Sequence, residues 1–200
     1  MKTPDFFDNI APIKMYDPLA QQLGAFTDGL ISYTYLDMVK LAGHSCPTVA
    51  GAWIMTCLGL EKLYGDGVPV RGDIKIEMRD GLADGVAGVI GQCISLVTGA
   101  GNEGGFKGIG MNYARNNRLL YGCDIAGEVR LSRLDGGQTV TMQYDPSAVP
   151  FHPQIKPLMP KIGQGTITAD EKAFFAAEWQ NRVEKIVAQR EKWGQFLTFV

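Results

Sequence analysis

The chain has 200 residues, of which 46% are hydrophobic, and its 19 basic and 21 acidic side chains give a formal net charge of −2. A nucleic-acid-binding surface needs clustered lysines and arginines, and no such cluster is visible, so DNA and RNA are not expected partners. No stretch approaches the roughly 20 apolar residues of a membrane span, and residues 1–20 lack the apolar core of a signal peptide, so we expect a cytoplasmic protein.

The first part of the chain predicts an irregular arm followed by a helix. Residues 1–15 look irregular. Asp17 is a plausible helix cap because Pro18 follows at the first helical position. Apolar residues then recur at helical spacing at positions 19, 23, 26 and 30.

Two further helices are expected before the first strand. The segment 33–43 predicts a short helix that Gly43 ends. The segment 47–65 predicts a longer helix with Pro47 at its first position and a glycine at its end. Its apolar residues Val49, Trp53, Cys57, Leu60 and Tyr64 follow helical spacing, which predicts that one face is buried.

The middle of the chain mixes strands with one helix. Alternation from Ile74 to Arg79 predicts a half-buried strand. The segment 86–99 is compatible with a helix or a buried strand, and we favour the helix. Residues 119–125 predict a strand, and 127–145 predict a hairpin that turns at Asp135-Gly136-Gly137.

A proline-rich arm and a helix complete the chain. Residues 145–165 contain five of the ten prolines. The last helix, 168–193, opens with a capping box of Thr168 and Glu171. Its predicted apolar face consists of Phe175, Trp179, Val183, Ile186, Val187 and Arg190.

This order of elements predicts an α+β fold with two layers, in which helices cover one face of a mixed or antiparallel sheet and a long C-terminal helix is added. We expect residues 1–150 to form the α+β domain. Residues 151–200 would pack on its core or on a partner subunit.

The glycine-rich stretch 99–104, GAGNEG, matches the spelling of a dinucleotide-binding motif. The segment that follows it has further glycines and a poor apolar stripe, so the helix that such a motif requires is not expected. We interpret the stretch as a glycine-rich loop near a site.

The most specific chemical pattern is His44-x-Cys46-Pro47. With Pro47 at the first helical position, Cys46 is the cap residue, and the positive end of the helix dipole favours its thiolate. A thiolate and an imidazole are good ligands for zinc or iron. The pattern is also compatible with an ordinary helix start.

The other cysteines and the second histidine differ in their prospects as ligands. Cys57 lies 11 residues down the same helix, about 16 Å from Cys46, and is expected in the core. Cys93 is the best third metal ligand, and Cys123 is expected in the core. His152 could cover the mouth of a pocket or lie in a solvated loop.

The stretch GHSCP followed by TVAGAW, a strand, the helix-like GVIGQCISLVTG and a glycine-rich loop resembles the FmdE-like family of formylmethanofuran dehydrogenase proteins over residues 30–145. The resemblance implies a dimeric α+β protein with a bound metal, commonly zinc, that is accessory to a metalloenzyme. By position, His44 and Cys46 match the family's metal-binding pair. The second motif of the family, an Asp-Ala-Ile-Gln stretch followed by Thr-Gly-Cys, matches less well. Gln92 and Cys93 stand where the family has Asp-Ala, and Ala100 replaces a cysteine.

Two other functions remain open from the residues alone. The first is a haem-binding or other tetrapyrrole-binding protein, with His44, Cys46 and His152 as axial ligands. The second is an assembly factor that docks through the 168–193 helix. A zinc-binding homodimer of undefined reaction, with a small molecule or metal as its partner, remains the preferred interpretation.

Overall fold

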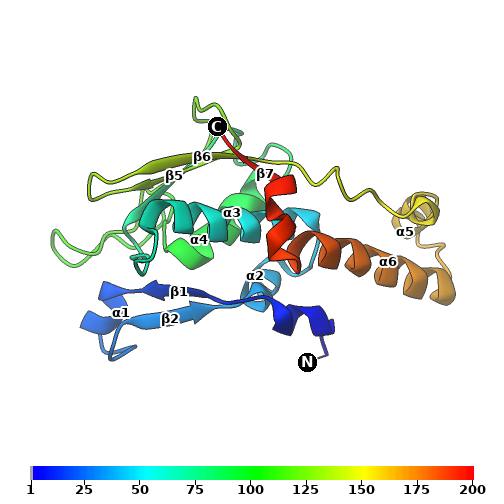
Figure 1. Cartoon of the computed structure of the whole chain (residues 1–200), viewed down its shortest axis with the longest axis horizontal. Coiled ribbons are helices and arrows are strands. Elements are labelled where there is room, and N and C mark those ends of the chain that lie inside the picture. Colours follow the sequence, from blue (N-terminus) through cyan, green and yellow to red (C-terminus); the bar gives the residue numbers. More distant parts are fainter. Residues whose placement is uncertain (1) are drawn as a thin grey trace.

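The computed structural model of the protein describes residues 2–200 and has an α+β architecture. It contains a five-stranded sheet and a small two-stranded sheet. In Figure 1, helices lie on one face of the larger sheet, and the smaller sheet lies on the far side of those helices. The predicted fold class is confirmed: the sheet is mixed and the helices lie on one side of it. The two-stranded sheet is an addition that the sequence does not predict.

The five-stranded sheet has the order β4-β3-β5-β6-β7. Only the pairing of β3 with β4 is parallel, and the other neighbours are antiparallel. The strands are β3 (Ile74–Met78), β4 (Leu119–Leu120), β5 (Val129–Arg133), β6 (Thr139–Tyr144) and β7 (Leu197–Phe199). Strand β3 buries every second residue, as its alternating sequence predicts. The strand expected over residues 119–125 is β4 in the structure, and it is two residues long.

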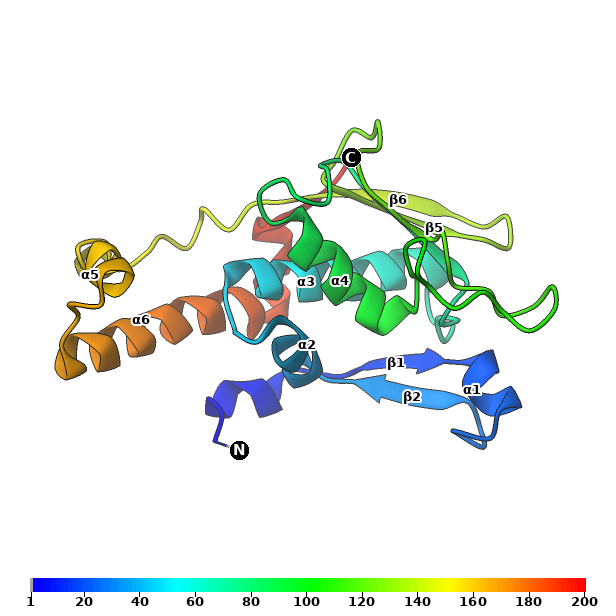
Figure 2. The same ribbon diagram turned by 180° about the vertical axis from the view of Figure 1, so that it is seen from behind.

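Helix α3 (Pro47–Tyr64) occupies the centre of the molecule, beside α4 (Ala87–Thr98) (Figure 2). Cys46 caps α3 and Gly65 follows its last residue, as predicted. Between Val49 and Leu60, Leu58 is the only residue of α3 that is not buried, so burial extends beyond the single face expected. The reason is position, since α3 packs against β6, α4 and α6 at the same time.

The N-terminal part differs from its prediction. The sequence predicts one helix from residue 17 towards residue 30, but α1 ends at Gln22 (Pro18–Gln22), and the chain returns as a strand. The arm predicted over 1–15 contains a 3₁₀-helix, Asp5–Asn9, and strand β1 (Ile13–Tyr16), which pairs antiparallel with β2 (Leu30–Tyr33). Leu19 lies in α1, but the residues at 23 and 26 lie in the turn that follows it, because pairing of residues 30–33 with β1 requires the chain to reverse its direction.

The predicted end of the second helix is confirmed at α2 (Tyr35–Ala42). Thr34 and Asp37 form a capping box at its start. Gly43 ends it in the left-handed conformation with φ of 75°, which an L side chain rarely adopts. This turn sets the direction of the following His44–Cys46 segment.

The C-terminal part joins the core of the same chain. After α5 (Leu158–Gln164), helix α6 (Ala169–Val187) begins at the predicted capping box of Thr168 and Glu171. It ends at Val187, six residues before the predicted end, because the buried Trp193 folds back and its Nε1 donates to the Val187 carbonyl at 3.1 Å. A 3₁₀-helix, Arg190–Gln195, then leads into β7.

The buried face of α6 is confirmed for Val183, Ile186 and Val187, which lie in the main hydrophobic cluster. Phe175 and Trp179 are half-buried, and Arg190 lies beyond the helix and is exposed. None of the helices described within residues 2–200 is both long and apolar enough to cross a membrane.

Candidate functional site

Of the predicted ligand pair, His44 and Cys46, it is Cys46 that lies in the interior, at the start of the central helix. Its extended backbone makes it the N-cap residue of α3, and its Sγ accepts a hydrogen bond from the Val49 amide at 3.5 Å. The side chain is buried. The thiol therefore lies where the helix dipole adds a partial positive charge, as the sequence predicts.

Cys93 reaches the same region from a different element. It lies on α4, is 1% exposed, and is close enough to Cys46 for a charge on one sulfur to act on the other. Burial raises the pKa of the Cys93 thiol to about 12, with a smaller contribution from Cys46. Burial likewise raises the pKa of Tyr35, and both cysteines add to this shift. Tyr35, Cys46 and Cys93 thus form one buried cluster.

The segment that carries Cys46 is tied to its surroundings through Ser45. The Ser45 and Tyr35 hydroxyl oxygens are 3.0 Å apart in a hydrogen bond. The Ser45 carbonyl accepts from Trp179 Nε1 at 2.9 Å and from Gln180 Nε2 at 3.2 Å. Helix α6 therefore positions this segment, although 134 residues separate Ser45 from Trp179 in the sequence.

His44 is exposed at the protein surface. Its Nδ1 lies 2.9 Å from the Ala42 carbonyl oxygen. A carbonyl can only accept, so Nδ1 carries the proton, and in the neutral ring Nε2 keeps a free lone pair. This is the arrangement in which a histidine ligand is oriented through its second nitrogen.

The arrangement brings two predicted ligands together and leaves the third apart. Within residues 2–200, no three His, Cys, Asp or Glu side chains gather closely enough to hold a metal ion. Cys46 and Cys93 place two thiols in the interior, whereas His44 is exposed. A zinc site ordinarily uses three or four protein ligands, so the thiol pair alone is not a complete set.

The remaining candidates lie elsewhere. Cys57 is buried beside Leu60 and Glu61, and it lines a separate cavity of about 280 Å³. Cys123 is half-buried after β4, where the sequence predicts a core position. His152 lies on the proline-rich arm, with its ring 5.5 Å from that of Phe174 and its Nδ1 accepting from the Gln154 amide. It also lines a cavity of about 420 Å³ between the arm and α6.

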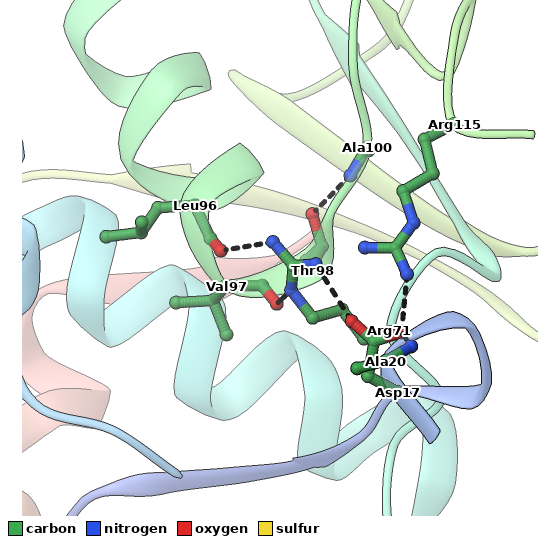
Figure 3. Close-up of polar contacts among 8 residues, drawn as sticks. All are labelled: Asp17, Ala20, Arg71, Leu96, Val97, Thr98, Ala100 and Arg115. Carbon is green, nitrogen blue, oxygen red and sulfur yellow. Dashed lines mark hydrogen bonds and ion pairs between the residues drawn. The ribbon is translucent and has the colours of Figure 1, made fainter. Parts of the chain in front are cut away.

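A second polar cluster lies at the C-terminal end of α4, and the sequence does not predict it. Figure 3 shows Arg71 and Arg115 converging on Asp17. Arg71 Nη1 donates to Asp17 Oδ2 at 3.0 Å, and Arg115 Nη2 donates to Asp17 Oδ1 at 2.6 Å. Burial acts to raise the pKa of Asp17, but the hydrogen bonds from Arg115, the Ala20 amide and Arg71 lower it overall.

Arg71 also closes the C-terminal end of α4. Its Nε and Nη2 donate to the carbonyls of Val97 and Leu96 at 3.1 and 3.0 Å. A guanidinium in this place satisfies helix carbonyls that lack an intrahelical partner and complements the negative end of the dipole.

The sequence contains few signals for this second cluster. It identifies Asp17 only as a helix cap, a role that Asp17 also fulfils through the Ala20 amide at 3.0 Å. Arg115 lies in the loop that follows the glycine-rich stretch. That stretch is predicted to lie near a site, and Gly99 does abut Arg115, since a Cβ at Gly99 would lie 2.7 Å from Nη1.

No protein-family model matches this chain, and neither a curated protein nor a solved structure matches it significantly. The resemblance to the FmdE-like family therefore stays a prediction from the motif residues.

Proposed function

We propose that the protein binds a transition-metal ion, zinc in the first place, through Cys46 and Cys93, with His44 as a third ligand. The observation that carries the proposal is the pair of buried thiols, brought together from α3 and α4 at the positive end of α3. Thiolates with imidazole are a ligand set typical of zinc.

The thiol pair has a chemical reason to bind a metal. The pKa of Cys93 is raised, so this thiol is protonated near neutral pH in the metal-free protein. A bound cation would displace the proton and replace an uncharged, buried sulfur by a neutralised thiolate. Metal affinity would consequently rise with pH.

His44 would complete the site through Nε2. The residue lies two positions from Cys46, and its Nδ1–H is already held by the Ala42 carbonyl. Gly43, with its left-handed conformation, gives the segment a point at which it can turn. Two thiolates and one imidazole leave a fourth position for water or a small molecule, which is the ligand number of a catalytic zinc site.

The test is the metal content of protein purified without a histidine tag. Elemental analysis should find about one zinc ion per chain, and both Cys46→Ser and Cys93→Ser should lose it. Cys57→Ser is the matched control, because Cys57 is a buried cysteine of the same helix α3, about 16 Å further along. Substoichiometric metal, or equal loss in all three variants, would refute the site.

An absorption spectrum of the same sample addresses the tetrapyrrole alternative. An intense band near 400 nm, the Soret region, would favour haem or another tetrapyrrole, and a featureless visible spectrum with bound zinc supports the present proposal. The His152→Ala variant should leave the zinc content unchanged, since His152 lies on the arm beside Phe174.

We also propose that the chain forms a homodimer, and that it acts as an accessory protein to a metalloenzyme, as the resemblance implies. Light scattering coupled to gel filtration should then give twice the 21.8 kDa of one chain. A mass of one chain at micromolar concentration would contradict the dimer without bearing on the metal site.

A further inference from the structure

A small cavity of about 160 Å³ lies beside the buried Asp17 cluster and is lined by four charged side chains: Arg71, Asp73, Arg115 and Arg118. Tyr113 and the backbone of Gly72 contribute to its wall. The cavity lies at the start of β3 and borders the loop that follows the glycine-rich stretch, well apart in the chain from the His44–Cys46 segment. It is smaller than the roughly 300 Å³ at which drug-sized pockets begin, so it suits one small group.

Positive charge exceeds negative charge around the cavity. Three arginines face two aspartates, Asp17 and Asp73, and Asp17 is already shared by Arg71 and Arg115. Asp73 makes no ion pair within 4.0 Å among the described residues. Burial and the nearby Asp135 raise the pKa of Asp73, while Arg118 and Arg133 act to lower it.

Arg115 has an unused donor. Its side chain is 10% exposed, and only Nη2 has an acceptor, the Asp17 carboxylate. The Nε atom is buried and has no hydrogen-bond partner among residues 2–200. A buried N–H without an acceptor is costly, and a bound ion or water is one way in which such a group is satisfied.

Arg118 also borders the cavity, and unlike Arg115 it has no ion-pair partner among the described residues. The residue is half-buried, and its side chain forms no hydrogen bond or ion pair with any residue that the structure describes. Burial lowers the pKa of Arg118; the nearby Asp73 opposes this shift and Arg115 adds to it. Two under-satisfied guanidinium groups thus border the same cavity.

We propose that this cavity is a binding site for a phosphate-sized oxyanion, held by the guanidinium groups of Arg115 and Arg118. Guanidinium groups present planar pairs of donors that match phosphate oxygens, and charge-assisted hydrogen bonds of this kind are strong when shielded from water. The proposal is independent of the metal site, because the two sites share no residue.

The probe is inorganic phosphate, titrated calorimetrically into the full chain in a chloride buffer of constant ionic strength. We expect saturable binding with one phosphate per chain and an upward shift of the thermal midpoint, since a ligand of the native state stabilises it. Arg118→Gln should weaken binding at least tenfold. Arg118→Lys keeps the charge but loses the planar pair of donors. Its phosphate affinity should therefore lie between those of the wild type and Arg118→Gln.

Arg79→Gln is the matched control. Arg79 follows the opposite end of β3, pairs with Asp80 and does not line the cavity, so phosphate affinity should not change. Equal weakening in Arg79→Gln and Arg118→Gln, or no saturable binding to the wild-type chain, would overturn the proposal. A phosphomonoester titrated in parallel separates two sources: tighter binding of the ester indicates a phosphorylated ligand, and exclusion of the ester indicates the free ion.

Discussion

Arg115 donates to Asp17 at 2.6 Å across a sequence separation of 98 residues, and both side chains are almost fully shielded from solvent. This ion pair joins the N-terminal hairpin to the loop that follows the glycine-rich stretch. Together with Arg71, these two residues form the charged cluster shown in Figure 3.

Replacing Asp17 by Asn should destabilise the protein strongly, because two guanidinium groups would lose their counter-charge in a buried place. The breaking of a buried ion pair typically costs about 3–5 kcal/mol. Urea unfolding followed by circular dichroism would measure the change in the free energy of unfolding. Asp135→Asn, which removes an exposed ion pair with Arg133, should have little effect.

The same carboxylate predicts a dependence of stability on pH. The folded pKa of Asp17 is lowered below its ordinary value of about 3.9, so the folded state binds this proton less readily than the unfolded state does. The contribution of Asp17 to the free energy of unfolding is fully present above the unfolded pKa and is lost as the pH falls through the folded pKa. Urea midpoints measured at decreasing pH should fall less steeply in Asp17→Asn than in the wild type. Parallel curves would contradict this assignment.

The four thiols should differ in reactivity in the folded, metal-free protein. Cys123 is half-buried, whereas the other three cysteines are buried, and burial raises the pKa of Cys57 and Cys93. Because the thiolate is the reactive form, a disulfide reagent at neutral pH should modify Cys123 first. Mass spectrometry after partial labelling identifies the site, and Cys123→Ser should abolish the fast phase. Rapid labelling of Cys93 would show that its surroundings open readily.

Two glycine-to-alanine substitutions in helices should differ in their effect on stability. A Cβ at Gly51 of α3 would overlap the ring of Tyr144 on β6, so Gly51→Ala should destabilise by about 1–3 kcal/mol despite the helix preference of alanine. At Gly163 of α5 a Cβ would meet open space, so Gly163→Ala should be neutral or stabilise by up to about 1 kcal/mol. Thermal unfolding of both variants measures the difference. Destabilisation by both would contradict the packing argument.

Local signals in the sequence predict the elements whose formation depends on neighbouring residues. The capping box at Thr168, the Cys46 cap of α3, the glycine that ends α2, and the alternation of β3 all act within a few residues, and each is confirmed. The fold class follows from the order of these elements. The hairpin of β1 and β2 escapes such signals because its strands are short and stabilise each other only when paired.

The sequence by itself therefore determined the helix boundaries near Gly43 and Pro47 and the position of Cys46 at the start of α3, since caps and turns are short-range effects. Only the tertiary structure decided which side chains meet. Cys46 and Cys93 come together because α3 packs on α4, and His44 lies apart because the turn at Gly43 leaves it at the surface. Asp17, Arg71 and Arg115 meet because a buried carboxylate requires counter-charges, and the chain supplies them from segments 54 and 98 residues away.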